Sequence, residues 1–278
     1  MYDLHTHSYC SDGTLSPTEL VRTAHANGVR VLALTDHDTL EGIAEASEAA
    51  SNKLLDDMTI ITGIELSTQW RGRGIHIVGL NVDIDSPELQ QAVERQTQVR
   101  IKRAQTIADK LEKSGIKGAL DGARHYAGQG AIGRPHFAQY MVDAGYVGSI
   151  PQAFKRYLGA GKVGDVKQCW PDIDEAVQWI SAAGGIAVLA HPDKYDLTRT
   201  KLYELLGDFV EAGGQAMEVV SGHQDKTVTQ KLARAANDFS LLASCGSDFH
   251  SPNNTWQSLG GYSALPDDVA PVWTQFTS

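Results

Sequence analysis

Two histidines separated by one residue, His5 and His7, follow a short apolar stretch at the start of the chain. Side chains on a strand alternate between its two faces, so both imidazoles point the same way where that strand ends. Further histidines and carboxylates border other apolar runs, at Asp12, His37, Glu65, His76, His191, Asp248 and His250. Imidazole and carboxylate groups together are typical ligands of divalent metal ions. The pattern therefore predicts a metal centre at the ends of strands.

The number of candidate ligands predicts more than one ion. Nine side chains exceed what one ion binds, so we expect two or three ions that share a carboxylate. Ligands of this kind suit Mn²⁺, Zn²⁺ or Fe²⁺, and Mg²⁺ less well because so many are histidines. Cys10 lies nearby in the sequence but is not needed as a ligand. Asp36 and Asp38 flank His37 and are candidates either to orient imidazoles or to stabilise a turn.

The elements that would position these ligands alternate between strands and helices. Strands are predicted for the apolar runs Tyr2–His5, Val31–Thr35, Thr59–Glu65, Ile75–Val82, Ile186–Ala190, Ala216–Val220 and Leu241–Ser244. Helices are predicted after Ser16 and at Leu40–Ser51, 87–114, Phe137–Ala144, Ile150–Tyr157, Asp172–Ala183, Thr198–Ala212 and Lys226–Phe239. This alternation predicts an α/β fold with a parallel sheet closed into a barrel. Most candidate ligands then follow strand ends on one face, but His76 begins its apolar run and has no explanation on this basis.

One segment interrupts the alternation. Residues 100–168 are predicted to form an inserted, mostly helical subdomain, with residues 1–99 and 169–278 forming the barrel. Residues 100–167 hold 12 of the 24 Lys and Arg residues but 5 of the 34 Asp and Glu residues. A basic segment in an acidic chain suggests contact with an anion, although a solvated helix face would have the same composition.

Several motifs resemble the PHP (polymerase and histidinol phosphatase) superfamily. The resemblance runs through the whole chain and rests on HTH…D, TDHD, GIELS, HIVGL, LAHP and GSDFH. The RPHF and FKRYL segments of the insertion are similar to the branch that contains RNase AM-type 5′→3′ exoribonucleases and nucleoside 3′,5′-bisphosphate phosphatases.

The resemblance implies a distorted (β/α)7 barrel with three divalent ions, Mn²⁺ being favoured. It implies one ion held by His5, His7, Glu65 and Asp248, a second held by Glu65, His76 and His191, and a third held by Asp12, His37 and His250. Glu65, Asp248 and His191 are expected to be catalytic, as ligands of the ions that activate the attacking hydroxide.

Four side chains are candidates for substrate binding. Arg134 and His136 are expected to reach a phosphate from the insertion, although His136 could simply pack in its helix. The family pattern has arginine at the position of Lys194. Lysine lacks the forked geometry of arginine and Asp193 adds a negative charge beside it, so a weaker phosphate contact is expected there. His223 follows a strand on the same rim. In relatives tryptophan directly follows glutamine, whereas Cys169 separates Gln168 from Trp170 here. This one-residue shift is expected to move the aromatic side chain away from a substrate base.

The predicted function is metal-dependent hydrolysis of phosphate esters of nucleotides. The substrate would be the 5′ end of short RNA, a nucleoside 3′,5′-bisphosphate, or both. Alternatives are a phosphatase of the histidinol-phosphate type, an amidohydrolase, and a non-catalytic RNA-binding module with a vestigial metal site. The glycine patterns at 128–133 and 159–164 lack the context of a dinucleotide site.

Composition adds expectations about location and partners. The 278 residues contain no apolar run of membrane-spanning length and no recognisable export signal at the start. Three scattered cysteines favour a reducing cytoplasm over a disulfide framework. No obligatory protein partner is predicted.

Overall fold

The strands form one curved sheet that nearly closes on itself. The computed structural model describes residues 1–128, 130–166 and 169–276. The strand order follows the sequence: β1 (Tyr2–Asp3), β2 (Val31–Leu34), β3 (Thr59–Trp70), β4 (Arg73–Leu80), β5 (Ile186–Leu189), β6 (Ala216–Ser221) and β7 (Leu242–Gly246). The Leu4 N–H donates to the Cys245 carbonyl at 3.1 Å, which joins the first strand region to the last. The predicted α/β barrel is confirmed.

The expectation of a parallel sheet is wrong for one strand. β4 pairs antiparallel with both β3 and β5, whereas the other neighbouring strands pair parallel. Arg71 and Gly72 connect β3 to β4 with φ values of 49° and 75°, as in a two-residue hairpin turn. The reversal also explains His76. Because β4 runs backwards, its beginning lies at the end of the barrel where the parallel strands finish, and His76 pairs with Ser67 of β3.

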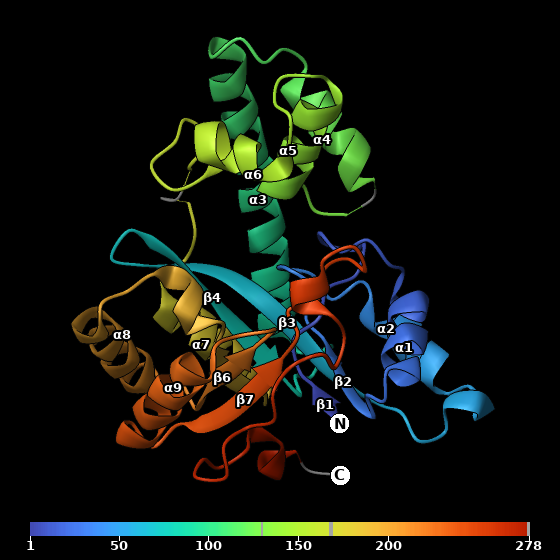
Figure 1. Cartoon of the computed structure of the whole chain (residues 1–278), viewed down its shortest axis with the longest axis vertical. Helices are drawn as coiled ribbons and strands as arrows, with labels where there is room; N and C mark the ends of the chain where they lie inside the picture. The colour runs from blue at the N-terminus through green and yellow to red at the C-terminus, as the bar shows by residue number, and fades with distance from the viewer. Residues whose placement is uncertain (129, 167–168, 277–278) are drawn as a thin grey trace.

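Helices surround the barrel, with α1 and α2 on one side and α7, α8 and α9 on the other (Figure 1). Their bounds are α1 (Pro17–Ala26), α2 (Ile43–Ala50), α7 (Ile173–Ala182), α8 (Arg199–Glu211) and α9 (Lys226–Asp238). Ser16 caps α1 with a capping box completed by Glu19, as the sequence indicates.

The long helix α3 (Pro87–Lys113) leaves the barrel and carries a cluster of shorter helices at its far end (Figure 1). These are α4 (Ala119–Ala127), α5 (Arg134–Asp143), α6 (Ile150–Ala153) and the π-helical turn η2 (Phe154–Leu158). They share a hydrophobic cluster with the last turns of α3, centred on buried side chains such as Ile107, Phe137 and Met141. This part of the chain therefore has apolar packing of its own beside the barrel.

Side chains from all seven strands meet in another cluster, as the inward-facing residues of a barrel do. Its buried members include Ala33, Val78, Val188 and Ala216, and Tyr2 and Leu242 pack against them. The C-terminal turn η5 (Val272–Gln275) joins the same cluster. The barrel interior is thus a packed core, and polar side chains gather at one end of it. Within the described part of the chain, no helix is long and apolar enough to cross a membrane.

Candidate metal centre

The carboxylate of Glu65 lies at the centre of the polar cluster, with imidazoles facing both of its oxygens. Its side chain is 1% exposed. Oε2 faces three ring nitrogens, those of His5 at 3.2 Å, His7 at 3.3 Å and His37 at 3.0 Å. Oε1 faces His76 at 2.9 Å and His191 at 3.0 Å. A carboxylate with nitrogen ligands at each oxygen has the geometry of a bridge between two metal ions.

Two further acids complete the cluster. Asp248 Oδ1 lies 3.6 Å from His5 Nε2 and 3.4 Å from His7 Nε2, so it joins the group on the Oε2 side of Glu65. Asp12 lies 3.2 Å from His250 and 3.8 Å from His37.

The structure brings all nine predicted ligands together. Three groups of them could each hold an ion, namely His7–Asp12–His37–His250, His5–His7–Glu65 and His37–Glu65–His76. His7, His37 and Glu65 each belong to two of these groups. His191 and Asp248 belong to none of them and join the cluster through Glu65, His5 and His7.

Two of these ligands have an uncommon backbone conformation. Asp248 and His191 have φ values of 53° and 28°, a region that residues other than glycine rarely adopt. Each follows a parallel strand of the barrel, β7 and β5 respectively. Such backbone strain is concentrated at functional sites, where the surrounding packing holds it in place.

The electrostatics of the cluster fit bound cations. Burial alone would lower the pKa of His7, but Asp248 and Glu65 outweigh it and raise that pKa to about 10. Burial would raise the pKa of Glu65, yet His37, His5 and His76 hold it well below its usual range. Among the described residues, buried atoms without a hydrogen-bond partner include Asp12 Oδ1 and Glu65 Oε2. Buried polar atoms are rarely left unsatisfied, so these oxygens are suited to metal ligation.

Glu218, on β6, is a component that the sequence analysis missed. It is 1% exposed. Its Oε1 lies 2.5 Å from His5 Nδ1, and its Oε2 accepts the backbone N–H of His191 at 2.7 Å. The available signal was a lone acid within the apolar run Ala216–Val220, which is otherwise typical of a buried strand.

Among the described residues, Asp36 and Asp38 make no direct hydrogen bond to a ligand imidazole and instead hold neighbouring loop, strand and helix segments. Asp36 accepts hydrogen bonds from the hydroxyls of Ser8 and Ser11, both at 2.6 Å. Asp38 accepts from Arg100 Nε at 2.7 Å and from the Ser67 N–H at 2.7 Å. Asp36 therefore shapes the loop that carries Asp12, and Asp38 joins β3 to α3.

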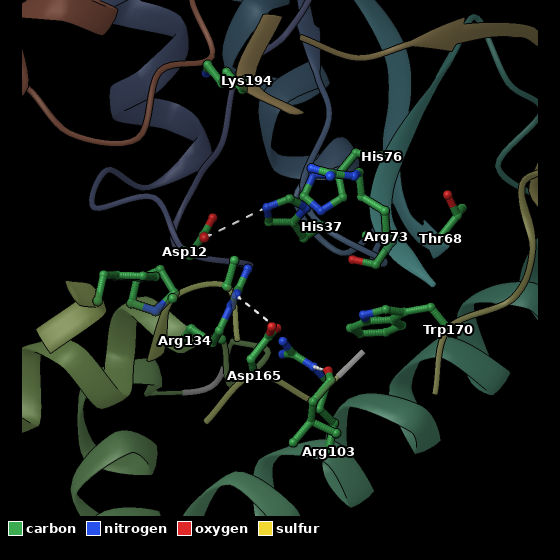
Figure 2. A pocket seen from close by; sticks show the side chains of 18 of the residues that line it. Asp12, His37, Thr68, Arg73, His76, Arg103, Arg134, Asp165, Trp170 and Lys194 are labelled. Atoms are coloured by element: carbon green, nitrogen blue, oxygen red, sulfur yellow. Dashed lines mark hydrogen bonds and ion pairs between the residues drawn. The ribbon is translucent and has the colours of Figure 1, made fainter. Parts of the chain in front are cut away.

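A cleft of about 470 Å³ opens beside the cluster, between the barrel mouth and the insertion (Figure 2). In the view of Figure 2, Arg103, Arg134 and Trp170 lie on one side of His37 and His76, and Lys194 lies on the other. The Arg103 and Arg100 guanidiniums lie 5.2 and 5.4 Å from the centre of the Trp170 ring. Burial and the neighbouring arginines lower the pKa of Arg103 to about 10. Crowded cations of this kind favour an anion in the cleft.

The four predicted substrate contacts differ in position. Arg134 lines the cleft and donates to the Leu158 carbonyl at 3.2 Å. Lys194 also lines it, but its ammonium is paired with Asp248.

The two histidines lie elsewhere. The Gly133 N–H donates to His136 Nδ1 at 3.0 Å, so this ring helps to begin α5. His223 is exposed outside the cleft, with its ring edge-on to Trp256 at 5.6 Å. Trp170 lines the cleft despite its shift in sequence, while Gln168 lies outside the described residues.

Comparison with known proteins gives one family and full-length relatives. A model of the PHP domain family matches residues 3–185. A 5′-3′ exoribonuclease of Haemophilus influenzae is 51% identical over 275 residues, which cover 99% of this chain and 98% of the relative. A 3′,5′-nucleoside bisphosphate phosphatase of Chromobacterium violaceum is 40% identical, over 98% of this chain and 95% of the relative.

A solved structure shares the whole architecture. It is described as an amidohydrolase from Chromobacterium violaceum with bound sulfate and no metal. It is 40% identical, covers 99% of this chain and 95% of its own, and superposes with a TM-score of 0.90.

Proposed function

This chain belongs to the PHP domain family, and we propose that it is a metal-dependent phosphoesterase that acts on nucleotides. The observation that carries the proposal is the position of Glu65, whose two oxygens face different sets of imidazoles beside a cationic cleft. Relatives of nearly full length are named for hydrolysis of phosphate esters of RNA and of nucleoside bisphosphates.

We propose that two or three divalent ions bind the nine clustered side chains. Mn²⁺ is favoured by the resemblance to the family, Zn²⁺ and Fe²⁺ also suit these ligands, and Mg²⁺ suits them less well because imidazoles predominate. Glu65 would bridge two ions, and Asp12 with His37 and His250 would hold a third. Such ions supply Lewis acidity and a nucleophile at neutral pH. Glu65, Asp248 and His191 would be catalytic by fixing where those ions lie.

Basic residues of the insertion are suited to bind a second phosphate of the substrate. Arg134 lines the cleft with Arg103 and lies 3.9 Å from Asp165. It begins the helix α5, whose Phe137 and Ala138 pack in the insertion's apolar cluster. We propose that residues 100–168 form a subdomain that caps the substrate, with Arg134 binding a terminal phosphate and Lys194 meeting the scissile one from the opposite side. The substrates would be 5′-phosphorylated RNA ends and nucleoside 3′,5′-bisphosphates. His136 and His223 would make secondary contacts.

The location we propose is the cytoplasm. Its support is chemical, since Cys10, Cys169 and Cys245 are all free thiols and free cysteines are typical of a reducing compartment.

The test of activity compares two substrates. Mn²⁺-loaded protein is incubated with a 5′-phosphorylated RNA tetramer and with 3′,5′-bisphosphoadenosine, and phosphate and mononucleotide release are followed. We expect turnover of at least one substrate that stops when a chelator is added. Tight RNA binding without any metal-dependent turnover would instead favour an RNA-binding module.

Arg134→Ala tests the anchoring role. Loss of a charge-assisted hydrogen bond costs about 1.5–3 kcal/mol, which corresponds to a fall of roughly 10- to 150-fold in kcat/KM. We expect this fall on 3′,5′-bisphosphoadenosine, mostly through KM, and a much smaller one on 3′-AMP, which lacks the second phosphate. Arg124→Ala removes an exposed arginine from the same insertion and is the matched control. Equal losses on both nucleotides would remove Arg134 from this role.

A further inference from the structure

The indole of Trp256 is exposed on the rim of the barrel mouth. It lies on the short turn η4 (Thr255–Gln257) and is 68% exposed, whereas Trp70 is 6% exposed. Indole rings contribute large apolar areas to cores and interfaces, so one exposed to solvent suggests a binding surface. The edge-on contact with His223 at 5.6 Å covers little of the ring.

Hydrogen bonds fix this rim relative to the metal centre. The amide of Gln257 donates to Asp248 Oδ2 at 2.8 Å, so the residue next to Trp256 touches a proposed metal ligand. The His223 N–H donates to the Trp256 carbonyl at 2.9 Å. Gly222 allows this approach, because a Cβ there would lie 3.0 Å from the same carbonyl oxygen. These contacts hold the backbone that carries the indole close to Asp248.

The rim segment has no acidic side chain that would repel a nucleic acid strand. Residues 249–266 contain no Asp or Glu, and no Lys or Arg. On the other side of the cluster, Arg103 and Arg134 of the insertion line the cleft together with Trp170 (Figure 2). A strand whose 5′ phosphate is held by Arg134 must continue away from the insertion. Lys194 and Gln257 meet at Asp248 on that side, next to Trp256.

We propose that Trp256, supported by His223, stacks on a nucleobase of single-stranded RNA on the 3′ side of the scissile phosphate. The inference rests on the proposed phosphoesterase function and extends it to a choice of substrate. Stacking of a base on an aromatic side chain contributes about 1–3 kcal/mol and tolerates any base. A nucleoside bisphosphate has no downstream base, so this contact would favour RNA over mononucleotides.

The test measures a ratio of specificities. kcat/KM is determined for a 5′-phosphorylated RNA tetramer and for 3′,5′-bisphosphoadenosine with the Mn²⁺-loaded protein. Trp256→Ala should lower the RNA-to-bisphosphate ratio by about 5- to 150-fold, the fold-change equivalent of one stacked base. Trp256→Phe should restore most of the ratio. Leu54→Ala, which truncates an apolar side chain that is 84% exposed on a distant turn, should leave the ratio as it is.

A second measurement separates failure of this inference from failure of the proposed function. Fluorescence anisotropy of a 3′-labelled, 5′-phosphorylated RNA tetramer reports binding to chelator-treated protein without turnover. Weaker RNA binding by Trp256→Ala and recovery of binding in Trp256→Phe would support stacking on Trp256 even if no substrate were hydrolysed. The proposed stacking on Trp256 is wrong if Trp256→Ala binds RNA as the wild type does, or if the substitution lowers both kcat/KM values equally.

Discussion

At the scale of single residues, Glu218 positions two predicted metal ligands at once. One oxygen lies 2.5 Å from His5 Nδ1, which leaves Nε2 of that ring directed at Glu65. The other oxygen accepts the N–H of His191, whose backbone has the strained φ of 28°. A carboxylate behind a ligating imidazole fixes the ring's orientation and increases its basicity. Glu218 thus acts on the centre without facing it.

Glu218→Gln tests this positioning role. Glutamine keeps the size of the side chain but loses the charge, and loss of such outer partners lowers metal affinity about 10- to 100-fold. We expect calorimetry to show weaker Mn²⁺ binding. The unfolding midpoint of the metal-free protein should stay close to that of the wild type. Glu211→Gln, an exposed acid at the end of α8, is the control. Unaltered Mn²⁺ affinity in Glu218→Gln would show that the contact is only structural.

Most of the metal ligands could be predicted from the sequence because they follow apolar runs. The residues that hold them in position could not. His5, His7, His37 and Asp248 lie at or near strand ends, and strand ends can be found from apolar runs. Glu65 ends its apolar run in the sequence but lies inside β3. Glu218 lies inside such a run, where an acid carries no sign of its partner. Which histidine Glu65 meets at each oxygen depends on side-chain directions that the sequence pattern does not encode.

At the scale of elements, the β3–β4 hairpin carries part of the site. β3 continues to Trp70, well beyond Glu65, and β4 returns alongside it so that His76 faces Glu65 Oε1. The sequence predicted two strands here but not their direction. The stretch from Leu66 to Gly74 is shorter than the dozen or more residues that a parallel crossover needs. The length of the connection therefore indicates antiparallel pairing of the two strands, which the apolar pattern does not.

A buried ion pair helps to join the helix α3 to the barrel. Arg100 contacts Asp38 Oδ2 through Nη2 at 2.6 Å, and its Nη2 also donates to Ser67 Oγ at 3.0 Å. Both charged side chains are buried. The pair joins the base of the insertion to the loop that follows β2, which also carries His37.

Arg100→Met should destabilise the fold by about 3–5 kcal/mol, because it leaves Asp38 buried without its partner charge. Urea unfolding measures this loss. The double substitution Arg100→Met with Asp38→Asn should recover part of it, since the unpaired charge is then removed. A loss below about 1 kcal/mol in the single variant would show that water reaches Asp38 and that the pair does not anchor the helix.

At the scale of the whole molecule, charge is divided between an acidic barrel and a basic insertion. Residues 100–167 contain half of the Lys and Arg residues, as the sequence analysis emphasised. Part of this charge is structural, as Arg100 shows, and part lines the cleft, as Arg103 and Arg134 show. The buried Arg100 does not fit the solvated helix face that the sequence left open as an interpretation, and contact of Arg103 and Arg134 with an anion stays a prediction. Composition counts charges but does not distinguish these uses.

Metal removal should change the stability of the whole chain. Without metal, His7 keeps its proton at neutral pH because its pKa is raised to about 10. The stability from that proton is complete below about pH 6.5 and is lost as the pH rises through about 10. Metal-free protein should therefore melt at a lower temperature at pH 9.5 than at pH 7.

Adding metal should have two measurable effects at pH 7. Mn²⁺ at 100 times its Kd should stabilise the fold by about 2.7 kcal/mol, a rise of roughly 5–10 °C in Tm for a chain of this size. Binding should also release protons, since His7 must give up its proton to ligate, and calorimetry in buffers of different ionisation enthalpy measures this release. Binding without proton release would contradict protonated ligands in the metal-free state.

The most direct test is a crystal structure of the Mn²⁺-loaded protein, with ions located by anomalous scattering. We predict at least two Mn²⁺ ions, one at each oxygen of Glu65, with His5 and His7 on one side and His76 and His191 on the other. A single ion, or ions that leave Glu65 uncoordinated, would contradict it.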